Sequence, residues 1–247
     1  MSRVAVVTGG ASGIGLGVAR GFANDGHRVA IVDSNGAAAE AAADELRSEG
    51  AAALAVDVDV VDRASVVAGF DRVRAELGPV EILVTSAGIE AFTPILDITA
   101  ELWDRIIGVN LTGTFTCVQA ALPDMLSGGW GRIVTISSSS AQSGAPNMAH
   151  YVASKGGVIA LTKALAVDLA RLGITVNTIP PSLVDTPMVD KAEAAGDFPG
   201  IAVVGPMVPV GRAGTPADIA AACSFLCSED GAYITGQVIG VNGGMYI

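Results

Sequence analysis

The chain has 247 residues, of which 51% are hydrophobic and 16% charged, and this composition argues against a disordered protein. A net charge of −11, without runs of Lys and Arg, argues against nucleic-acid binding, because phosphates need a basic patch. The length suits a single α/β domain with one continuous sheet.

Short apolar runs alternate with longer amphipathic or Ala-rich segments along the whole chain. Nearly continuous apolar runs are typical of strands that are buried on both faces of a parallel sheet. The predicted strands are 4–8, 28–32, 53–56, 82–85, 132–137, 175–179 and 237–241. The predicted helices lie near 13–25, 36–49, 62–77, 101–126, 150–171 and 215–228. This repeated βαβ order predicts one Rossmann-type, doubly wound parallel sheet of about seven strands with helices on both faces.

The least regular stretch, 182–212, contains several Pro and Gly residues, and we expect a loop or lid over the site there. No linker-like change of composition divides the chain, so residues 1–247 are predicted to form one domain. The first residues lack the pattern of a signal peptide, and no apolar run is long and uninterrupted enough to suggest a membrane span.

Cysteine and histidine are rare. The cysteines, Cys117, Cys223 and Cys227, form an odd set without Cys-x-x-Cys spacing, which indicates reduced thiols and a cytoplasmic protein. Cys223 and Cys227 share one face of a predicted helix and are interpreted as core residues. Because His27 and His150 are the only histidines, we expect no metal site.

A glycine-rich turn, TGGASGIG at 8–15, follows the first predicted strand and precedes the first predicted helix. Gly9, Gly13 and Gly15 let the backbone turn sharply and approach a pyrophosphate closely. The helix that follows offers free amides and a positive dipole end to the phosphates. Such a turn alone is a weak signal, but its place between a strand and a helix predicts a dinucleotide site.

Asp33 ends the second predicted strand, where a carboxylate can accept hydrogen bonds from the adenosine ribose hydroxyls and repel a 2′-phosphate. No Arg or Lys occupies 10–16 or 34–39, so we predict NAD rather than NADP. The alternative for Asp33 is a surface acid that caps the next helix. Asp57 ends the third strand and is predicted to touch the adenine edge, although a plain turn aspartate fits nearly as well.

Tyr151 and Lys155 are four residues apart in a predicted helix and therefore share one face. A phenol with a pKa of ~10 is a poor acid–base group at neutral pH, but a neighbouring ammonium favours the phenolate and lowers that pKa. The lysine can also hold the nicotinamide ribose. Tyr-x-x-x-Lys alone is common and usually marks only a helix face, so its weight depends on the residues that accompany it.

Ser138 and Asn110 are the other candidates for the chemistry. Ser138 ends a predicted strand, and its hydroxyl could hold the substrate oxygen beside the phenol. It is one of four consecutive serines at 137–140, and small polar residues populate loops in any case. Asn110 lies inside a predicted helix, where an Asn can kink the helix or hold a water that relays protons to Lys155. Taken alone, Asn110 would be interpreted as a surface residue.

Together these residues make the chain resemble the short-chain dehydrogenases/reductases over essentially its whole length. The matching pieces occur in the family's order: TGGASGIG at 8–15, Asp57, SAG at 86–88, Asn110, Ser138, YVASK at 151–155, a Pro-rich turn after Asn177, and VNGG at 241–244. The resemblance implies that Tyr151 is the general acid/base and that Ser138 positions and polarises the substrate oxygen. It also implies that Lys155 lowers the pKa of Tyr151 and binds ribose, and that Asn110 supports a proton relay.

The resemblance further implies one NAD-binding domain with an extended cofactor site. Val184 and Thr186 match the positions that hold the nicotinamide carboxamide. The residues expected to bind the cofactor are Gly9, Ser12, Gly13, Ile14, Gly15, Asp33, Asp57, Val58, Ala87, Gly88, Asn110, Tyr151, Lys155, Pro181, Val184 and Thr186. A homo-oligomer, commonly a tetramer joined through the helices near 101–126 and 150–171, is expected from the same resemblance.

Three departures from the family pattern matter. Ser86 replaces the Asn of the usual Asn-Ala-Gly, which weakens an expected polar contact in the sheet. Residues 180–182 read Pro-Pro-Ser where the family has Pro-Gly, so Ser182 replaces a glycine near the nicotinamide. The family's ketoacyl reductases typically use NADP, often with a basic residue in the glycine-rich turn, whereas Ser12 stands there and Asp33 follows. This favours an NAD-linked, catabolic dehydrogenase over fatty-acid synthesis.

The leading hypothesis is an oxidoreductase that transfers a hydride between NAD(H) and a secondary alcohol or ketone. The alternatives are a 3-oxoacyl thioester reductase, a non-catalytic NAD(H)-sensing module, and an epimerase or dehydratase acting on nucleotide sugars. The last class usually carries a larger substrate domain.

The substrate pocket is predicted from residues that are mostly small or apolar, which favours a neutral, moderately hydrophobic substrate. Its expected boundary consists of Ser140, Gln142, Asn147, Ser182, Met188 and the 190–210 loop. No Arg is clearly placed to clamp a carboxylate or phosphate, although Lys191 or Arg212 could swing inward.

Overall fold

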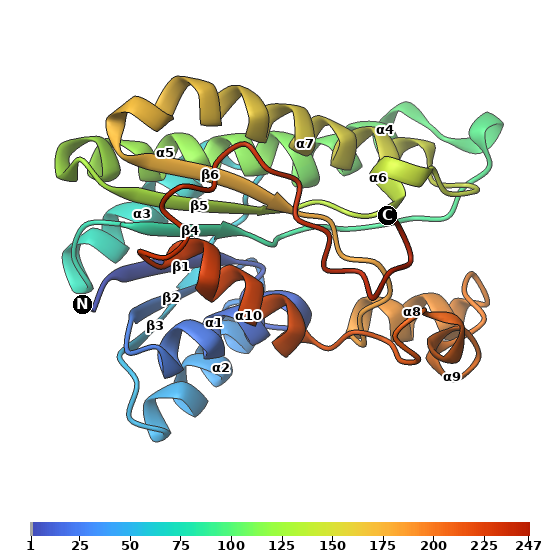
Figure 1. Ribbon diagram of the computed structural model, residues 1–247, viewed down its shortest axis with the longest axis horizontal. Coiled ribbons are helices and arrows are strands. Elements are labelled where there is room, and N and C mark those ends of the chain that lie inside the picture. The colour runs from blue at the N-terminus through green and yellow to red at the C-terminus, as the bar shows by residue number, and fades with distance from the viewer. Residues whose placement is uncertain (1) are drawn as a thin grey trace.

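Six parallel strands form one sheet, in the order β3-β2-β1-β4-β5-β6, in the computed structural model, which describes residues 2–247 (Figure 1). The strands are β1 Val4–Thr8, β2 Arg28–Asp33, β3 Ala53–Asp57, β4 Ile82–Thr85, β5 Gly131–Ile136 and β6 Ile174–Ile179. The strand order reverses between β1 and β4. In open α/β sheets, a ligand binds at the carboxyl ends of the strands beside such a reversal.

Helices cover both faces of the sheet, because alternate residues of each strand point to opposite faces and nearly all are apolar. The helices on one face are α1 (Gly13–Asn24), α2 (Gly36–Ser48) and α10 (Pro216–Cys227). The helices on the other face are α3 (Arg63–Glu76), α5 (Gly113–Gly128) and α7 (Ala149–Leu169). The predicted doubly wound architecture is therefore confirmed.

The seventh predicted strand, 237–241, is not part of the sheet. It lies beside β6, where the amide of Thr178 donates to the Gln237 carbonyl over 3.0 Å, but only Thr178 and Val238 form a bridge. Gly236 and Gly243 adopt φ of +71° and +61° on either side of this segment. The amides of Gly236 and Ile239 also donate to the Val176 and Thr178 carbonyls, each over 2.8 Å, so the segment pairs with β6 only around Thr178.

The stretch 182–212, predicted as a loop, is partly helical. It contains α8 (Pro187–Ala195), α9 (Ile201–Val204) and the 3-10 turn η4 (Gly205–Met207), which lie beyond the carboxyl end of the sheet in Figure 1. Proline suits the first position of α8, since its fixed φ is helical and it lacks only an amide that would be unpaired there. We call this stretch, residues 182–212, the lobe. A bridge between Val184 and Gly214 brings its two ends together.

Residues Ala100–Gly128 form a continuous helical stretch made of α4 (Ala100–Ile107), the π-turn η2 (Gly108–Thr112) and α5. By length and composition alone, this stretch of 29 residues, which contains an 18-residue window with a mean hydropathy of 1.2, could cross a membrane, contrary to the sequence expectation. The core helix of a globular protein passes the same test. Here 44% of the apolar window is buried, and Cys117, Val118 and Ala121 pack in the core.

All three cysteines are buried free thiols, and Cys223 and Cys227 lie in the core between α10 and the sheet, as predicted. Burial raises the pKa of Cys223 to about 12 because the thiolate loses its solvation. These thiols therefore act as small apolar side chains.

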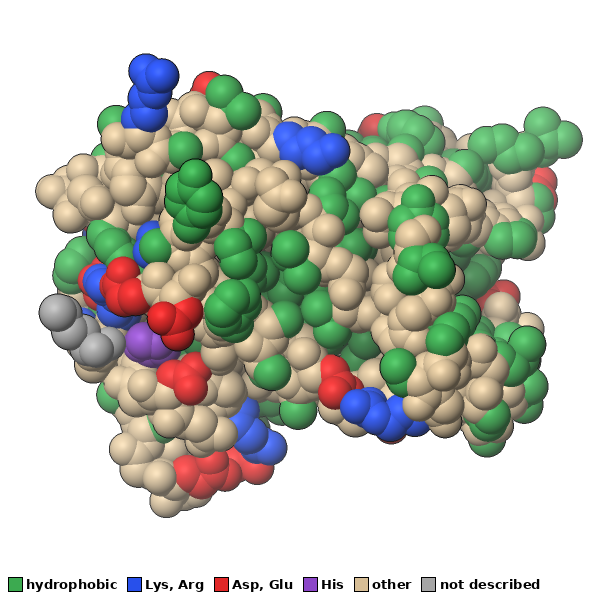
Figure 2. Space-filling model, in the orientation of Figure 1, with side chains coloured by type: hydrophobic (Ala, Val, Ile, Leu, Met, Phe, Trp, Pro, Cys, Tyr) green, Lys and Arg blue, Asp and Glu red, His purple; other side chains and the backbone are tan. Residues whose placement is uncertain are grey.

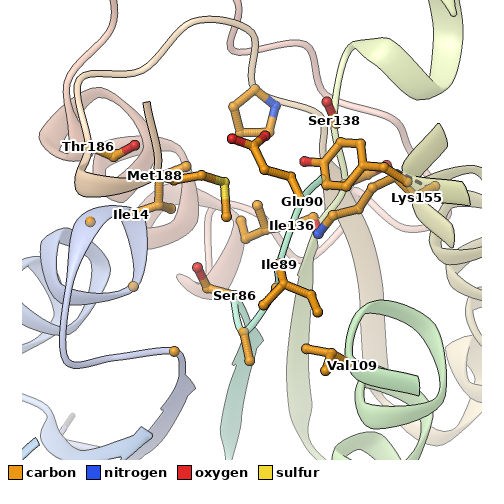
Figure 3. Close-up of a pocket in the computed structure, with 18 of the residues that line it drawn as sticks. Ile14, Ser86, Ile89, Glu90, Val109, Ile136, Ser138, Lys155, Thr186 and Met188 are labelled. Carbon is orange, nitrogen blue, oxygen red and sulfur yellow. Dashed lines mark hydrogen bonds between the residues drawn. The ribbon is translucent and has the colours of Figure 1, made fainter. Parts of the chain in front are cut away.

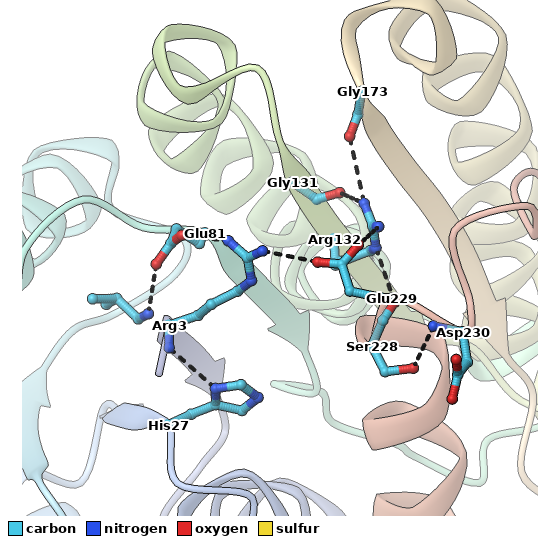
Figure 4. A network of polar contacts seen from close by, with 10 residues as sticks. Arg3, His27, Glu81, Gly131, Arg132, Gly173, Ser228, Glu229 and Asp230 are labelled. Carbon is cyan, nitrogen blue, oxygen red and sulfur yellow. Dashed lines mark hydrogen bonds and ion pairs between the residues drawn. The ribbon is translucent and has the colours of Figure 1, made fainter. Parts of the chain in front are cut away.

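The amino end of the sheet is closed by a network of ion pairs (Figure 4). Arg3 contacts Glu81 over 2.7 Å and Glu229 over 2.9 Å. The ring of Trp130 packs against the guanidinium groups of Arg3 and Arg132, at 3.4 and 4.3 Å from the ring centroid. This end of the sheet is occupied by structural contacts, which leaves the opposite end for a ligand.

Candidate active site

A cavity of about 1180 Å³ opens at the carboxyl ends of the strands. Its lining comes from the turn after β1, the segments after β2, β3, β4 and β5, the start of α7, and the lobe that carries α8. This volume exceeds that of a typical small-molecule pocket, which is roughly 300–1,000 Å³. The cavity therefore has room for a large cofactor together with a substrate.

The glycine-rich turn forms the floor of one end of this cavity. A Cβ at Gly15 would lie 2.1 Å from the Gly9 carbonyl oxygen, and a Cβ at Gly9 would lie 2.8 Å from the Ala87 backbone. The helix α1 begins at Gly13, and the side chain of Ser12 does not cap its first amides. A close backbone approach and free amides at a helix N-terminus are what a pyrophosphate requires, so these residues fit a dinucleotide.

Asp33 lines the same end of the cavity. Its carboxylate accepts hydrogen bonds from the amides of Ala11, at 3.2 Å, and Asn35, at 3.0 Å, which hold it beside the glycine-rich turn. Asn35, not Asp33, caps α2 by accepting a hydrogen bond from the amide of Ala38. The alternative interpretation of Asp33 as the helix cap is therefore wrong.

Asp57 does not reach the cavity. It is exposed, and a Cβ at Gly36 would lie 3.0 Å from its carboxylate oxygen, so its side chain lies against the start of α2. Val58, the next residue, lines the cavity instead. The prediction that Asp57 touches the adenine edge has no support in this geometry, because its side chain leaves β3 toward α2.

Tyr151, Lys155 and Ser138 meet at the other end of the cavity. Tyr151 and Lys155 come from adjacent turns of α7 and are 8% and 4% exposed. The ammonium nitrogen of Lys155 donates to the Ile136 carbonyl over 2.9 Å and lies 5.8 Å from the centroid of the Tyr151 ring. Ser138 and Lys155 approach the cavity from β5 and α7 (Figure 3). The three side chains predicted to act together thus lie together, and their roles stay predictions.

The electrostatics of this end differ from the sequence expectation. Burial raises the pKa of Tyr151, the charge of Glu90 raises it further, and the Ser138 hydroxyl opposes both. Burial also lowers the pKa of Lys155 to about 8, while Glu90 opposes this change. The expected lowering of the Tyr151 pKa is not seen, because desolvation and the charge of Glu90 disfavour the phenolate more than the Ser138 hydroxyl favours it.

Asn110 is wholly buried in the π-turn η2 and does not line the cavity. Its side chain accepts a hydrogen bond from the amide of Ile89 at 2.9 Å and donates to the Ile89 carbonyl and to Ser154, both at 3.0 Å. The predicted irregularity in the helix is confirmed, and the alternative of a surface residue is wrong. Asn110 links the segment after β4 to α7, and π-turns of this kind are frequent at functional sites.

The remaining predicted cofactor residues, Ile14, Ala87, Gly88, Pro181, Val184 and Thr186, all line the cavity. A Cβ at Gly88 would lie 3.3 Å from both Asn110 and Lys155, which explains the glycine there. Ser86 also lines the cavity. The polar contact next to it comes from Thr8, whose hydroxyl accepts from the Ala87 amide over 3.1 Å. Ser182 donates to the Asn242 carbonyl over 2.9 Å and ties the start of the lobe to the C-terminal segment.

The predicted substrate boundary is only partly correct. Ser140, Ser182 and Met188 line the cavity, and Phe198 and Val204 are its lining residues from the 190–210 segment. Two predicted positions, Gln142 and Asn147, and both candidate cations, Lys191 and Arg212, do not line it. Arg212 is paired with Asp218 over 2.8 Å; Asp218 belongs to the first turn of α10, and Arg212 lies in the segment just before that helix begins at Pro216.

Sequence reasoning missed Glu90. This carboxyl group lines the cavity and acts on the pKa of both Tyr151 and Lys155. Its only sequence signal is its position two residues after the SAG motif, where the chain leaves β4.

Comparison with known proteins agrees with this geometry. The profile of the family described as Enoyl-(Acyl carrier protein) reductase matches residues 9–246. D-threitol dehydrogenase of Mycolicibacterium smegmatis is 40% identical over 245 residues, which cover 99% of this chain and 93% of that protein. The 3-oxoacyl-[acyl-carrier-protein] reductase FabG of Staphylococcus aureus is 38% identical over 248 residues, which cover 100% of this chain and 99% of that protein.

The reductase MabA of Mycobacterium tuberculosis is 37% identical over 99% of this chain and 93% of its own. The crystal structure of gox2181 superposes with a TM-score of 0.93, at 34% identity, over 98% of this chain and 95% of that one. The chain belongs to the short-chain dehydrogenase/reductase family. It is thus an oxidoreductase of a family that uses nicotinamide cofactors and acts on CH–OH and keto groups.

Proposed function

We propose that this protein is an NAD-dependent dehydrogenase/reductase that interconverts a secondary alcohol and a ketone, with Tyr151 as the general acid/base. The observation that carries this proposal is the single cavity that has Ser138, Tyr151 and Lys155 at one end and the glycine-rich turn with Asp33 at the other. A dinucleotide that spans this cavity supplies the acceptor or donor of the hydride when it is bound.

In alcohol oxidation, the phenol oxygen of Tyr151 takes the hydroxyl proton of the substrate as the C–H bond is broken; in ketone reduction it returns that proton. Ser138 holds the substrate oxygen with its hydroxyl. Lys155 places a cation beside the phenol, which favours its ionised form during the transfer. Asn110 holds the Ile89 backbone and Ser154 in place, and thereby positions the segment after β4 against α7.

The NAD preference rests on Asp33. A 2′-phosphate on the adenosine ribose would meet this carboxylate, and like charges at close range repel. The cationic side chains that line the cavity are Lys155 and Arg105, which come from α7 and α4 rather than from the segments around Asp33.

A 3-oxoacyl thioester reductase is the second candidate, because FabG and MabA are relatives over nearly the whole chain. The D-threitol dehydrogenase, a relative over a similar extent, favours a small polyol instead. A homotetramer and a cytoplasmic location are part of the main proposal. The buried free thiols agree with a reducing compartment.

The test follows nicotinamide absorbance with NAD and NADP against secondary alcohols, hydroxysteroids and 3-hydroxyacyl thioesters, and compares the wild type with Tyr151→Phe. We expect turnover with NAD and an alcohol, and a loss of about 10²–10⁴-fold in the variant, which lacks the acid/base oxygen. NADH titration should give similar affinities for both proteins. Wild-type turnover in Tyr151→Phe would remove this residue from the mechanism, and binding of NADH without turnover of any substrate would indicate a sensing module.

A further inference from the structure

Glu90 introduces a carboxyl group into the reacting end of the cavity. Four carboxyl groups line the cavity: Asp33, Asp59, Asp104 and Glu90. Of these, Glu90 alone acts on the pKa of Tyr151 and Lys155, so it lies at the substrate end rather than the nucleotide end. In Figure 3 the Glu90 carboxyl group points into the cavity between Met188 and Ser138.

The side chain of Glu90 has no hydrogen bond and no ion pair within residues 2–247, although it is only partly exposed. Apolar side chains supply much of the lining around it, including Ile89, Phe92, Met148 and Met188. The carboxyl oxygens are open to the cavity, so a substrate that covers them must offer a hydrogen-bond donor or leave the group unpaired at a cost. A hydrogen-bond partner can therefore reach Glu90 from the open side of the cavity, where the substrate would lie.

The charges around Glu90 indicate what kind of partner fits. Burial and the nearby charge of Asp197 raise the pKa of Glu90, while Lys155 opposes this change. Two acidic groups disfavour an anionic substrate. Of the two cations that line the cavity, Lys155 acts on the pKa of Glu90 and Arg105 does not, while Arg212 is held by Asp218 outside the lining. The ammonium of Lys155 in turn disfavours a cationic substrate. A neutral hydroxyl group suits both the ionised and the protonated form of the Glu90 carboxyl, because each form accepts a hydrogen bond.

We propose that Glu90 determines substrate specificity by accepting a hydrogen bond from a second hydroxyl group, so that the preferred substrate is a neutral diol or polyol. This inference rests on the proposed dehydrogenase function and names the substrate class of the same site. A simple secondary alcohol leaves Glu90 unpaired, and a site built to bind a hydroxyl rejects the analogue that lacks it.

The experiment compares kcat/KM for butane-2,3-diol and butan-2-ol, two substrates with the same carbon chain, with NAD as the oxidant. We expect the wild type to prefer the diol by about tenfold or more, mainly through KM. Glu90→Leu should bring the ratio of the two kcat/KM values close to one, whereas Glu90→Gln should keep part of the preference, since its amide oxygen still accepts a hydrogen bond. Asp190→Asn is the matched control, because it removes a carboxylate from an exposed position on α8 that does not line the cavity.

The outcomes separate the two proposals. Equal kcat/KM values for both alcohols in the wild type overturn the role of Glu90 and leave the dehydrogenase function standing. An unchanged ratio in Glu90→Leu, with pH profiles displaced equally for both substrates, shows that Glu90 acts only on Tyr151 and also overturns the inference. Failure to oxidise butane-2,3-diol, while another alcohol of the wider panel is oxidised with NAD, overturns the Glu90 inference and leaves the dehydrogenase function standing; no turnover with any member of the panel defeats the proposed function, and the Glu90 inference with it. Thermal unfolding of the isosteric Glu90→Gln variant shows whether a change in the ratio comes from a folded protein.

Discussion

At the scale of single residues, burial sets the chemistry of this cavity. Tyr151 and Lys155 are nearly inaccessible, and each has a pKa displaced toward its uncharged form. Burial of two ionisable groups lowers the stability of the fold, and such groups are commonly found at functional sites. The residues proposed for catalysis therefore oppose folding, and this conflict can be measured.

Lys155 should lower the stability of the folded protein at neutral pH. Its pKa of about 8 lies below the ordinary value of 10.5, so the unfolded chain binds more protons between these limits and the wild type gains stability as the pH rises through them. Lys155→Met should raise the free energy of unfolding at pH 7 by roughly 1–3 kcal/mol, and this gain should vanish above about pH 10.5. Urea unfolding at several pH values tests this.

The control for this prediction is Lys163→Met, on an exposed part of the same helix, which should change stability by less than about 0.5 kcal/mol at any pH. A loss of stability at pH 7 in Lys155→Met would show that its hydrogen bond to Ile136 outweighs the cost of burying the charge.

Asp33 should set the choice of cofactor. Asp33→Asn keeps a hydrogen-bond acceptor for the amide of Ala11 or Asn35 but removes the charge that repels a 2′-phosphate. We expect the ratio of kcat/KM for NADP to that for NAD to rise about tenfold, which corresponds to ~1.4 kcal/mol. Asp59→Asn, a second carboxylate in the cavity lining, is the matched control. An unchanged ratio in Asp33→Asn would assign cofactor choice to other residues.

At the scale of elements, the π-turn η2 connects two parts of the site. Through Asn110 it holds both polar backbone groups of Ile89 and the hydroxyl of Ser154, so the segment after β4 and the helix α7 keep one relative position. Tyr151 and Lys155 belong to that helix, while Gly88 and Glu90 belong to that segment. A change in η2 would therefore shift the backbone of the segment after β4 relative to α7, and with it the side chains of Glu90, Tyr151 and Lys155.

Asn110→Ala should destabilise the fold and reduce turnover together. It leaves the part-buried amide and carbonyl of Ile89 without their partner, at a cost of up to about 1–3 kcal/mol for each unsatisfied group. Urea unfolding gives the stability, and kcat measured well below the unfolding transition gives the effect on the site. Thr112→Ala, at an exposed position of the same π-turn, should change little. Unchanged stability in Asn110→Ala would mean that water replaces the amide.

At the scale of the whole molecule, exposed apolar side chains remain on the helices proposed to join subunits. Trp103 on α4, Phe115 on α5 and Val167 on α7 are 40%, 39% and 81% exposed. Figure 2 shows a further gathering of apolar side chains over the face where α10 and the C-terminal segment lie. Scattered apolar residues are ordinary on a monomer, so assembly has to be measured.

Analytical ultracentrifugation should show a species of four 24.7 kDa chains for the wild type. Phe115→Arg should shift it to smaller species, because a buried interface has no partner for the added charge. Ser48→Arg adds the same charge at an exposed position of α2, on the other face of the sheet, and should leave the assembly intact. Wild-type protein that sediments only as a monomer would contradict the proposed tetramer.

Local patterns were enough to predict the fold class and much of the site. Alternating apolar strands and amphipathic helices dictate a doubly wound sheet, because each element must bury its apolar surface. The glycine-rich turn and the Tyr151–Lys155 pair are likewise properties of short segments, since backbone sterics and helix geometry act within a few residues. These predictions needed no knowledge of which segments meet in space.

The tertiary structure alone decided the features that depend on neighbours distant in the sequence. Asp57 turns toward α2 and Glu90 enters the cavity, and neither is specified by a local pattern. The predicted seventh strand pairs with β6 only around Thr178 and therefore forms a bridge rather than a ladder. The raised pKa of Tyr151 is also decided by the tertiary structure. Desolvation depends on all the groups packed around the phenol, and not on Lys155 alone.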